Sequence, residues 1–140
     1  MQFMIIVKSG KDCEAGRKPS DEILAAVGNY TQELRRAGVL VELSRLEASS
    51  KGARIKFSRG KRTAIDGPFP ESKELIAGYW IIQVKSREEA IEWAKRAPAP
   101  HGPNEDSEIE LRQFFEMEDF GPSEAVDRAR ELGKELEKKK

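Results

Sequence analysis

The residue best placed to do chemistry is Asp66, in the run Asp66-Gly67-Pro68. At the mouth of an apolar cleft its carboxylate could act as a general base or hydrogen-bond acceptor, because burial shifts the pKa of an acid. Glu71 and Lys73 would then lie at the rim of that cleft. The same run is a strong turn pattern, since aspartate bonds to nearby backbone, glycine allows positive φ and proline fixes the next angle. Turn preferences favour the structural interpretation.

Three further side chains could orient or neutralise a bound molecule. Tyr30 and Tyr79 offer phenolic hydroxyls, and Arg112 offers a guanidinium. An arginine on an inner strand of a covered sheet must find an anion, either a carboxylate of the protein or a ligand. We expect a structural partner for Arg112 first, and keep all three as ligand-binding candidates beside Glu71 and Lys73.

The remaining candidate groups predict neither a metal nor a cofactor. His101 is the only histidine and lies in the flexible stretch Pro100-His101-Gly102-Pro103, so a solvated surface histidine is expected unless a dimer-related loop folds over the cleft. Cys13 has no second thiol for a disulfide or a zinc site. The acids around Glu105 lack the spacing of a calcium loop.

Helix and strand patterns alternate along the chain. Apolar residues recur every three or four positions over 20–37, between an N-cap serine and Gly38, and a capping box from Ser86 to Glu89 opens a second helix that ends before Pro98. The stretch from 9 to 18 reads as a polar loop, and a highly charged helix follows Pro122. Strands are expected at 1–8, 39–46, 78–85 and 109–115, with a hairpin at 53–65 that turns at Arg59-Gly60.

This order predicts an α+β, ferredoxin-like split βαβ subunit with an added C-terminal helix. Two crossover helices would cover one face of a largely antiparallel sheet. On the other face, Tyr79, Ile81 and Phe114 would form an exposed apolar patch of the kind that monomers avoid. A second copy is the economical cover, so we expect a homodimer whose two sheets face each other as an α/β barrel with a cleft in each subunit.

Composition limits the possible partners. The chain has 140 residues, and its 25 lysines and arginines balance 25 aspartates and glutamates. No net charge attracts nucleic acid or an acidic membrane, so neither is expected as a partner. The apolar start is too short for a membrane span and lacks a basic leader, which with the single cysteine predicts a cytoplasmic protein.

A longer pattern resembles a known family. Asp66-Gly67-Pro68-Phe69 is followed by Gly78-Tyr79-Trp80-Ile81-Ile82, and then by Ser86, Glu88-Glu89-Ala90 and Trp93-Ala94. This series resembles the DGPF branch of the YCII-related proteins over roughly the first 115 residues. The resemblance implies a dimeric α/β barrel of ferredoxin-like subunits, here assigned to residues 1–117, with 118–140 as a charged helical extension.

The resemblance also implies a histidine-aspartate dyad in some relatives, with the histidine on the first helix. The corresponding region here carries Asn29 and Tyr30 and no histidine, so that acid/base chemistry does not transfer. Two hypotheses remain open. The first is a noncatalytic dimer that binds a small, largely apolar or aromatic ligand or assists a partner protein; the second is a lyase- or hydrolase-type enzyme with Asp66 as general base.

Overall fold

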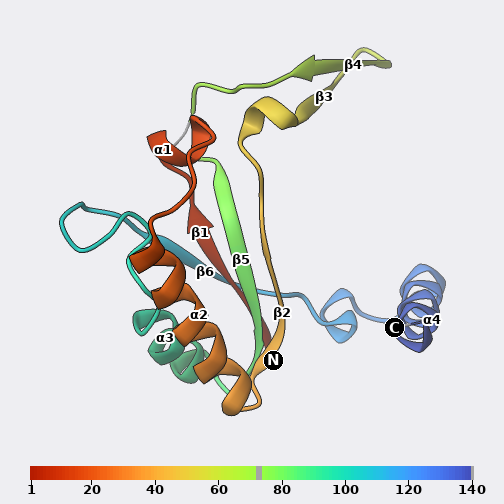
Figure 1. Ribbon diagram of the computed structural model, residues 1–140. Coiled ribbons are helices and arrows are strands. Elements are labelled where there is room, and N and C mark those ends of the chain that lie inside the picture. The colour runs from red at the N-terminus through yellow and green to blue at the C-terminus, as the bar shows by residue number, and fades with distance from the viewer. Residues whose placement is uncertain (72–73, 140) are drawn as a thin grey trace.

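The computed structural model describes residues 1–71 and 74–139. Its centre is a four-stranded antiparallel sheet in the order β2-β5-β1-β6, and a separate two-stranded sheet pairs β3 with β4 (Figure 1). The α+β class predicted from the sequence is therefore confirmed. The elements are β1 Gln2–Lys8, α1 Lys11–Glu14, α2 Asp21–Arg36, β2 Leu40–Arg45, η1 Ser49–Lys51, β3 Ala53–Ser58, β4 Lys61–Asp66, β5 Ile76–Gln83, α3 Arg87–Lys95, β6 Ile109–Gln113, η2 Met117–Phe120 and α4 Glu124–Lys138.

The structure confirms the predicted serine caps of α2 and α3 and the glycine at the end of α2. The Ser20 hydroxyl accepts a hydrogen bond from the Ile23 amide at 3.2 Å, and Gly38 has φ 72° where the chain leaves α2. Ser86 caps α3 by accepting from the Glu89 amide at 3.1 Å. The Glu89 carboxylate accepts from the Lys85 amide rather than from Ser86, so only half of the expected capping box forms.

One local prediction was wrong. The stretch 9–18 contains the short helix α1 rather than only a polar loop. Both acids of its first turn also hold neighbouring segments: Asp12 pairs with Arg17 at 2.9 Å, and Glu14 accepts from the Ser49 amide at 2.9 Å. These contacts supply what a weak local pattern lacks, since short helices depend on tertiary support.

Helices α2 and α3 cover one face of the four-stranded sheet (Figure 1). Strand alternation turns Phe3, Ile5, Trp80 and Ile82 toward these helices. The core that results also includes Tyr30, Leu34, Val39, Val84 and Ala90. Ile5, Leu34 and Ile82 are fully buried within it.

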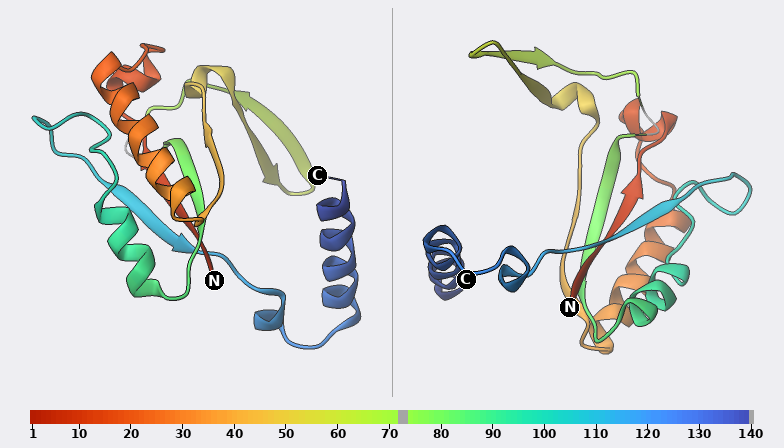
Figure 2. Two further views of the ribbon diagram at one scale, coloured as in Figure 1. Left: turned by 60° about the horizontal axis from the view of Figure 1, so that its bottom comes forward. Right: turned by 180° about the vertical axis from the view of Figure 1, so that it is seen from behind.

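The opposite face carries an apolar centre between polar edges. Cross-strand pairs place Met4 beside Ile81 and Ile6 beside Tyr79, and all four side chains are only partly buried. Helices α2 and α3 lie on the other side of the sheet in Figures 1 and 2, and in the described part of the chain α4 makes no substantial contact with this face, which we call the open face. The apolar patch expected from the sequence is present there, although Phe114 lies just beyond the end of β6.

Two segments extend away from this body. We call them the hairpin arm, residues 51–66 with β3 and β4, and the tail, residues 115–138 with η2 and α4. Arg59 and Gly60, with φ 49° and 78°, form the predicted tight turn at the tip of the arm. In Figures 1 and 2 both segments project on the side of the sheet away from α2 and α3.

Candidate functional site

The run Asp66-Gly67-Pro68-Phe69 forms the base of the hairpin arm. The Gly67 amide donates to the Gly52 carbonyl at 3.0 Å, and the Phe69 amide donates to the Ser49 hydroxyl at 2.9 Å. The Ser49 hydroxyl donates in turn to the Glu14 carboxylate. The run therefore fastens the arm to η1 and α1.

Gly67 is required here for a reason that differs from the expected one. Its φ is not positive, so left-handed backbone is not what selects glycine. A Cβ at this position would overlap the Ser49 carbonyl oxygen. Close approach of two backbone segments, rather than turn conformation, excludes a side chain.

Asp66 is the last residue of β4, pairs with Ala53 across the hairpin and is exposed. Its carboxylate forms no hydrogen bond or ion pair with any of the described residues. Asp66 also does not belong to the lining of the large cavity described below. The structure thus separates this acid from the other predicted site residues, and its role as a general base stays a prediction.

Glu71 lies near the base of the hairpin arm, where Arg54 binds it. The Arg54 guanidinium contacts the Glu71 carboxylate at 3.1 Å and stacks over the Phe69 ring at 3.9 Å. A backbone hydrogen bond and then the one from Arg54 hold the pKa of Glu71 below its usual value. Lys73, the other predicted rim residue, lies outside the described residues.

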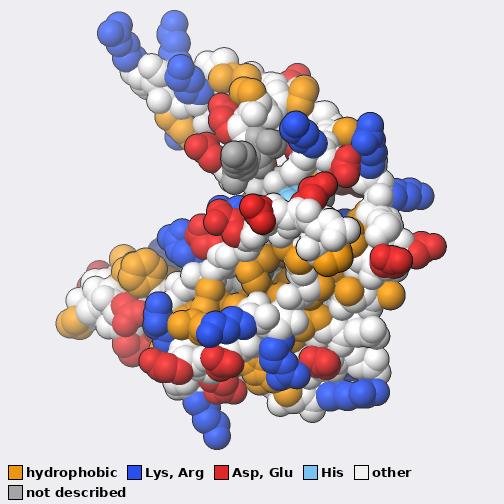
Figure 3. All heavy atoms as spheres, turned by 90° about the vertical axis from the view of Figure 1, so that its left-hand side faces the viewer, with side chains coloured by type: hydrophobic (Ala, Val, Ile, Leu, Met, Phe, Trp, Pro, Cys, Tyr) orange, Lys and Arg blue, Asp and Glu red, His pale blue; other side chains and the backbone are white. Residues whose placement is uncertain are grey.

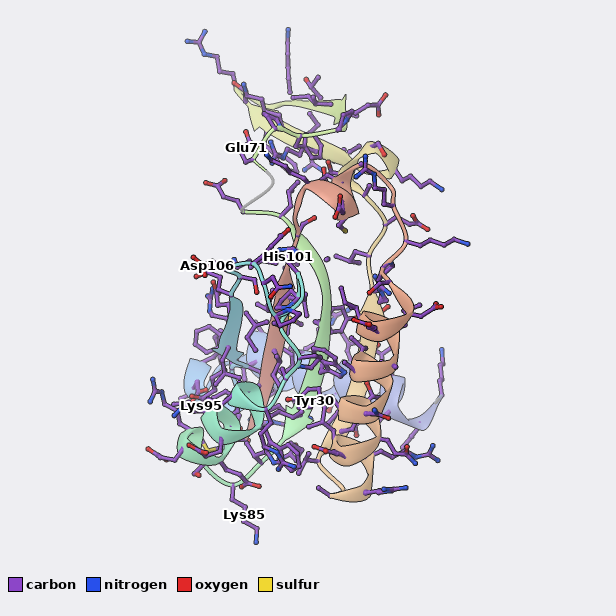
Figure 4. The ribbon with its side chains drawn as sticks, turned by 60° about the vertical axis from the view of Figure 1, so that its left-hand side comes forward. Tyr30, Glu71, Lys85, Lys95, His101 and Asp106 are labelled. Atoms are coloured by element: carbon purple, nitrogen blue, oxygen red, sulfur yellow. The ribbon has the colours of Figure 1, made fainter. Side chains whose placement is uncertain are left out.

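Tyr30 belongs to the core. Its ring meets Trp80 edge to face with centroids 5.0 Å apart, and its hydroxyl donates to the Trp93 carbonyl at 2.6 Å. Burial raises the pKa of Tyr30 well above its ordinary value. Figure 4 shows Tyr30 on α2, turned toward the sheet and far from Glu71 beside the hairpin arm.

Arg112 finds the protein carboxylate that was expected. It contacts Glu110 at 3.0 Å, and Lys8 contacts the same carboxylate at 3.3 Å. Hydrogen bonds from Arg112 and then Lys8 lower the pKa of Glu110. The placement of Arg112 on an inner strand was wrong, because β6 is the edge of the sheet and the Arg112 side chain is 71% exposed.

A cavity of about 450 Å³ lies at the end of the sheet where β1 finishes and β5 begins. That volume is typical of small-molecule sites. Its apolar wall comes from the core side of β1, α2, β2 and β5, namely Val7, Ile23, Val27, Leu43 and Trp80. Among the predicted ligand-binding residues that the structure describes, only Tyr79 is in the lining, although strand alternation directs its side chain to the opposite face from Trp80.

Charged residues surround this wall. The lining contains the cations Lys8, Arg17, Lys18 and Arg45 and the acids Asp12 and Glu105. Two of the cations already have acid partners: Arg17 lies 2.9 Å from Asp12, and Lys8 contacts Glu110. Within the described residues, Lys18 and Arg45 have no carboxylate in ion-pair range, so the rim carries an excess of positive charge.

His101 borders the cavity from the loop that follows α3. It is partly buried, and its imidazole packs so closely on Gly10 that a Cβ there would collide with the ring. Figure 3 shows the histidine in pale blue, recessed between neighbouring side chains, and Figure 4 shows it turned inward from its loop. The expected surface histidine is therefore only partly exposed to solvent, because the loop folds back over its own chain.

Comparison with known proteins identifies the family of this chain. A model of the YCII-related domain matches residues 1–116. The chain belongs to the YCII-related family. An uncharacterised protein of Rhizobium meliloti (strain 1021) is 30% identical to this YCII-related chain over 82 residues, which are 58% of the chain and 66% of the relative. The match therefore spans just under two thirds of the relative's own length.

Two other features are absent from the described residues of this YCII-related chain. Across 1–71 and 74–139, histidine, cysteine and carboxylate side chains do not gather in groups able to hold a metal ion. Over the same ranges, no helix has the length and apolar character needed to cross a bilayer.

The sequence signal for the cavity was weak. His101 is the only histidine in the sequence. Its position depends on Gly10, about ninety positions earlier, where the lack of a side chain leaves room for the imidazole. Cys13, for which the sequence predicts neither a disulfide nor a zinc site, also lines the cavity and is partly buried. Neither contact follows from local periodicity, because both depend on which loops meet at the end of the sheet.

Proposed function

We propose that this YCII-related chain binds a small organic anion with an apolar, preferably aromatic, body in the cavity beneath His101. The observation that carries the proposal is that the apolar wall around Trp80 and a cationic rim line the same cavity. Such a site would bury the body of the ligand against Trp80 and hold its charged end at the rim.

The rim favours a single negative charge on the ligand. Lys18 and Arg45 are the cations without an acid partner among the described residues, and Glu105 is the acid that remains after Asp12 pairs with Arg17. An arginine can bind a carboxylate through two parallel hydrogen bonds. His101 offers one further donor or acceptor to a polar group of the ligand.

The single cysteine gives a direct test, because Cys13 lines the cavity. We expect 1-naphthoate at saturating concentration to slow the reaction of Cys13 with a thiol-specific disulfide reagent at least threefold. The neutral analogue 1-naphthalenemethanol should protect much less. A Cys13→Ser, Lys85→Cys chain is the matched control, and its thiol should react at the same rate with and without naphthoate. Equal protection by both compounds, or none by naphthoate, would contradict the proposal.

A charge substitution tests the rim separately. Arg45→Gln should weaken naphthoate binding roughly tenfold, which corresponds to about 1.4 kcal/mol. Lys85→Gln removes an exposed cation outside the cavity lining and should leave the affinity unchanged. The same loss in both variants would show that only the overall charge matters, and not a site at Arg45.

The finer description of the fold is part of this proposal. The strand order β2-β5-β1-β6, with α2 and α3 on one face, supports a ferredoxin-like split βαβ subunit. The apolar centre of the open face supports pairing with a second copy into a dimeric α/β barrel. Ile81→Glu should give a folded monomer by sedimentation, whereas Gln83→Glu, at the end of the same strand, should stay dimeric.

Four narrower statements stay predictions. They are membership of the DGPF branch, the division at residue 117, the cytoplasmic location and the absence of a nucleic-acid partner. The enzyme hypothesis keeps Asp66 as its general base. Because Asp66 lies outside the cavity lining, Asp66→Asn should leave naphthoate protection of Cys13 unchanged.

A further inference from the structure

The hairpin arm exposes two unlike faces. Cross-strand pairs place Ile55 beside Ala64 and Phe57 beside Arg62 on one face, where Ile55 is 53% exposed and Phe57 67%. Lys56 and Lys61 lie on the other face. Basic side chains dominate the arm as a whole: Lys51, Arg54, Lys56, Arg59, Lys61 and Arg62, against Asp66 alone.

The tail exposes apolar and acidic side chains, which complement the apolar and basic side chains of the hairpin arm. Phe115 and Phe120 stack with ring centroids 5.0 Å apart and remain 75% and 55% exposed. Leu132 and Leu136 form an uncovered stripe on α4, which in the described structure packs substantially only on η2. From Phe115 to Asp127 every charged side chain is acidic: Glu116, Glu118, Asp119, Glu124 and Asp127.

The two segments leave opposite ends of the sheet. The arm starts beyond Arg45, which pairs with Gly78 near the beginning of β5. The tail starts beyond Gln113, which pairs with Phe3 at the end where Gln2 meets Gln83. A strand the length of β5 separates these ends by about 25 Å within one chain. Figures 1 and 2 show both segments on the open side of the sheet.

We propose that the hairpin arm of one copy docks on the tail of a second copy. A two-fold axis perpendicular to the strands would bring the arm end of one sheet over the tail end of the other, twice in each dimer. The apolar face with Ile55 and Phe57 would then cover the stripe at Leu132, and Arg62, which shares that face, would meet the acids of η2. This inference rests on the pairing through the open face proposed above.

A protein partner fits these observations better than nucleic acid. A two-stranded ribbon with lysines and arginines could enter a major groove. However, the acidic tail projects on the same side and would repel phosphates, and the large exposed side chains of the arm are aliphatic as well as aromatic. The chain as a whole carries no net charge to attract a polyanion.

Disulfide trapping between distinguishable chains tests the inference. One chain carries Cys13→Ser with Phe57→Cys, and a differently tagged chain carries Cys13→Ser with Leu132→Cys, so every disulfide must join two molecules. After mixing and mild oxidation, we expect the mixed product to exceed either self-linked product at least fivefold. Asn29→Cys, on the solvent side of α2, replaces Phe57→Cys as the matched control and should give no such excess.

The outcomes separate this inference from the proposals on which it rests. A stable dimer without the mixed product overturns arm-to-tail docking and leaves the pairing intact. A chain with both cysteines that closes only on itself would assign the tail to its own arm, which also overturns the inference. A monomer at all concentrations refutes the pairing itself, while protection of Cys13 by naphthoate is measured independently of both.

Charge reversal supplies a second readout. Arg62→Glu, or Glu118→Lys with Glu124→Lys, should each raise the dissociation constant of the dimer roughly tenfold. Mixing the two reversed chains should restore most of the affinity. If hairpin reversal abolishes binding to a short duplex DNA and leaves the dimer unchanged, the arm is a nucleic-acid site and the inference is wrong.

Discussion

The body and the two projecting segments of this chain differ in how completely one copy packs them. In the body, Leu34 and Ile82 lose all contact with solvent between the sheet and its helices. In the hairpin arm and the tail, residues of the same character, such as Phe57 and Leu136, keep about two thirds of their surface exposed, at 67% and 64%. One chain therefore buries its core completely but leaves the apolar side chains of its projecting segments largely exposed. Any partner that covers these side chains would add to the stability of the two segments.

The largest expected effect comes from deleting matched leucines on either side of this contrast. Leu34→Ala should lower the free energy of unfolding by about 2–5 kcal/mol, because it opens a cavity in a fully buried helix face. Leu132→Ala, also on a helix, should change it by less than about 0.5 kcal/mol in solutions dilute enough to hold monomers. Urea titrations followed by circular dichroism give both values. Similar losses in the two variants would mean that α4 is packed within a single copy.

The junction between body and arm should respond nearly as strongly. Gly67→Ala places a methyl group against the Ser49 carbonyl and should cost about 1–3 kcal/mol. Gly28→Ala is the control, since a Cβ on that exposed helical glycine meets nothing within 4 Å and should stabilise α2 by up to about 1 kcal/mol. A tolerated Gly67→Ala would show that the base of the arm shifts easily and does not constrain the hairpin.

The same contrast explains which features could be predicted from the sequence. The apolar alternation of β5, the serine caps and the Arg59-Gly60 turn are local patterns, and each is found where it was expected. The steric need for Gly67 and the inward turn of His101 depend on segments that meet only after folding. Local patterns therefore predicted the strands, helix caps and hairpin turn, whereas the cavity lining required the tertiary contacts among its loops.

Removing one hydroxyl tests how far the core tolerates a lost polar contact. Tyr30→Phe deletes the hydrogen bond to the Trp93 carbonyl and should cost about 0.5–1.5 kcal/mol at pH 7. Burial raises the pKa of Tyr30 above its value of 10.0 in the unfolded chain. Above pH 10 the unfolded chain loses this proton while the folded chain keeps it, so stability is full below pH 10 and falls as the pH rises further.

The variant isolates that pH dependence. Between pH 9 and pH 11.5, urea titrations should show the wild type losing up to about 1.4 kcal/mol per pH unit more than Tyr30→Phe above pH 10. Tyr79→Phe is the matched control, because Tyr79 lies on the opposite face of the sheet and is only partly buried. Parallel curves for the wild type and Tyr30→Phe would contradict burial as the cause.

The smallest effect is expected at the surface of the arm's base. Glu71 has a lowered pKa because it accepts hydrogen bonds from backbone and from Arg54, yet it is solvent-exposed, and such pairs are screened by water and salt. Any stability from a lowered carboxylate pKa is present above the unfolded pKa and disappears as the pH falls through the folded one. Glu71→Gln should therefore shift the urea midpoint slightly at pH 7 and not at pH 3. A shift as large as that of Gly67→Ala would mean that charge, and not the close backbone contact at Ser49, fastens the arm to the body.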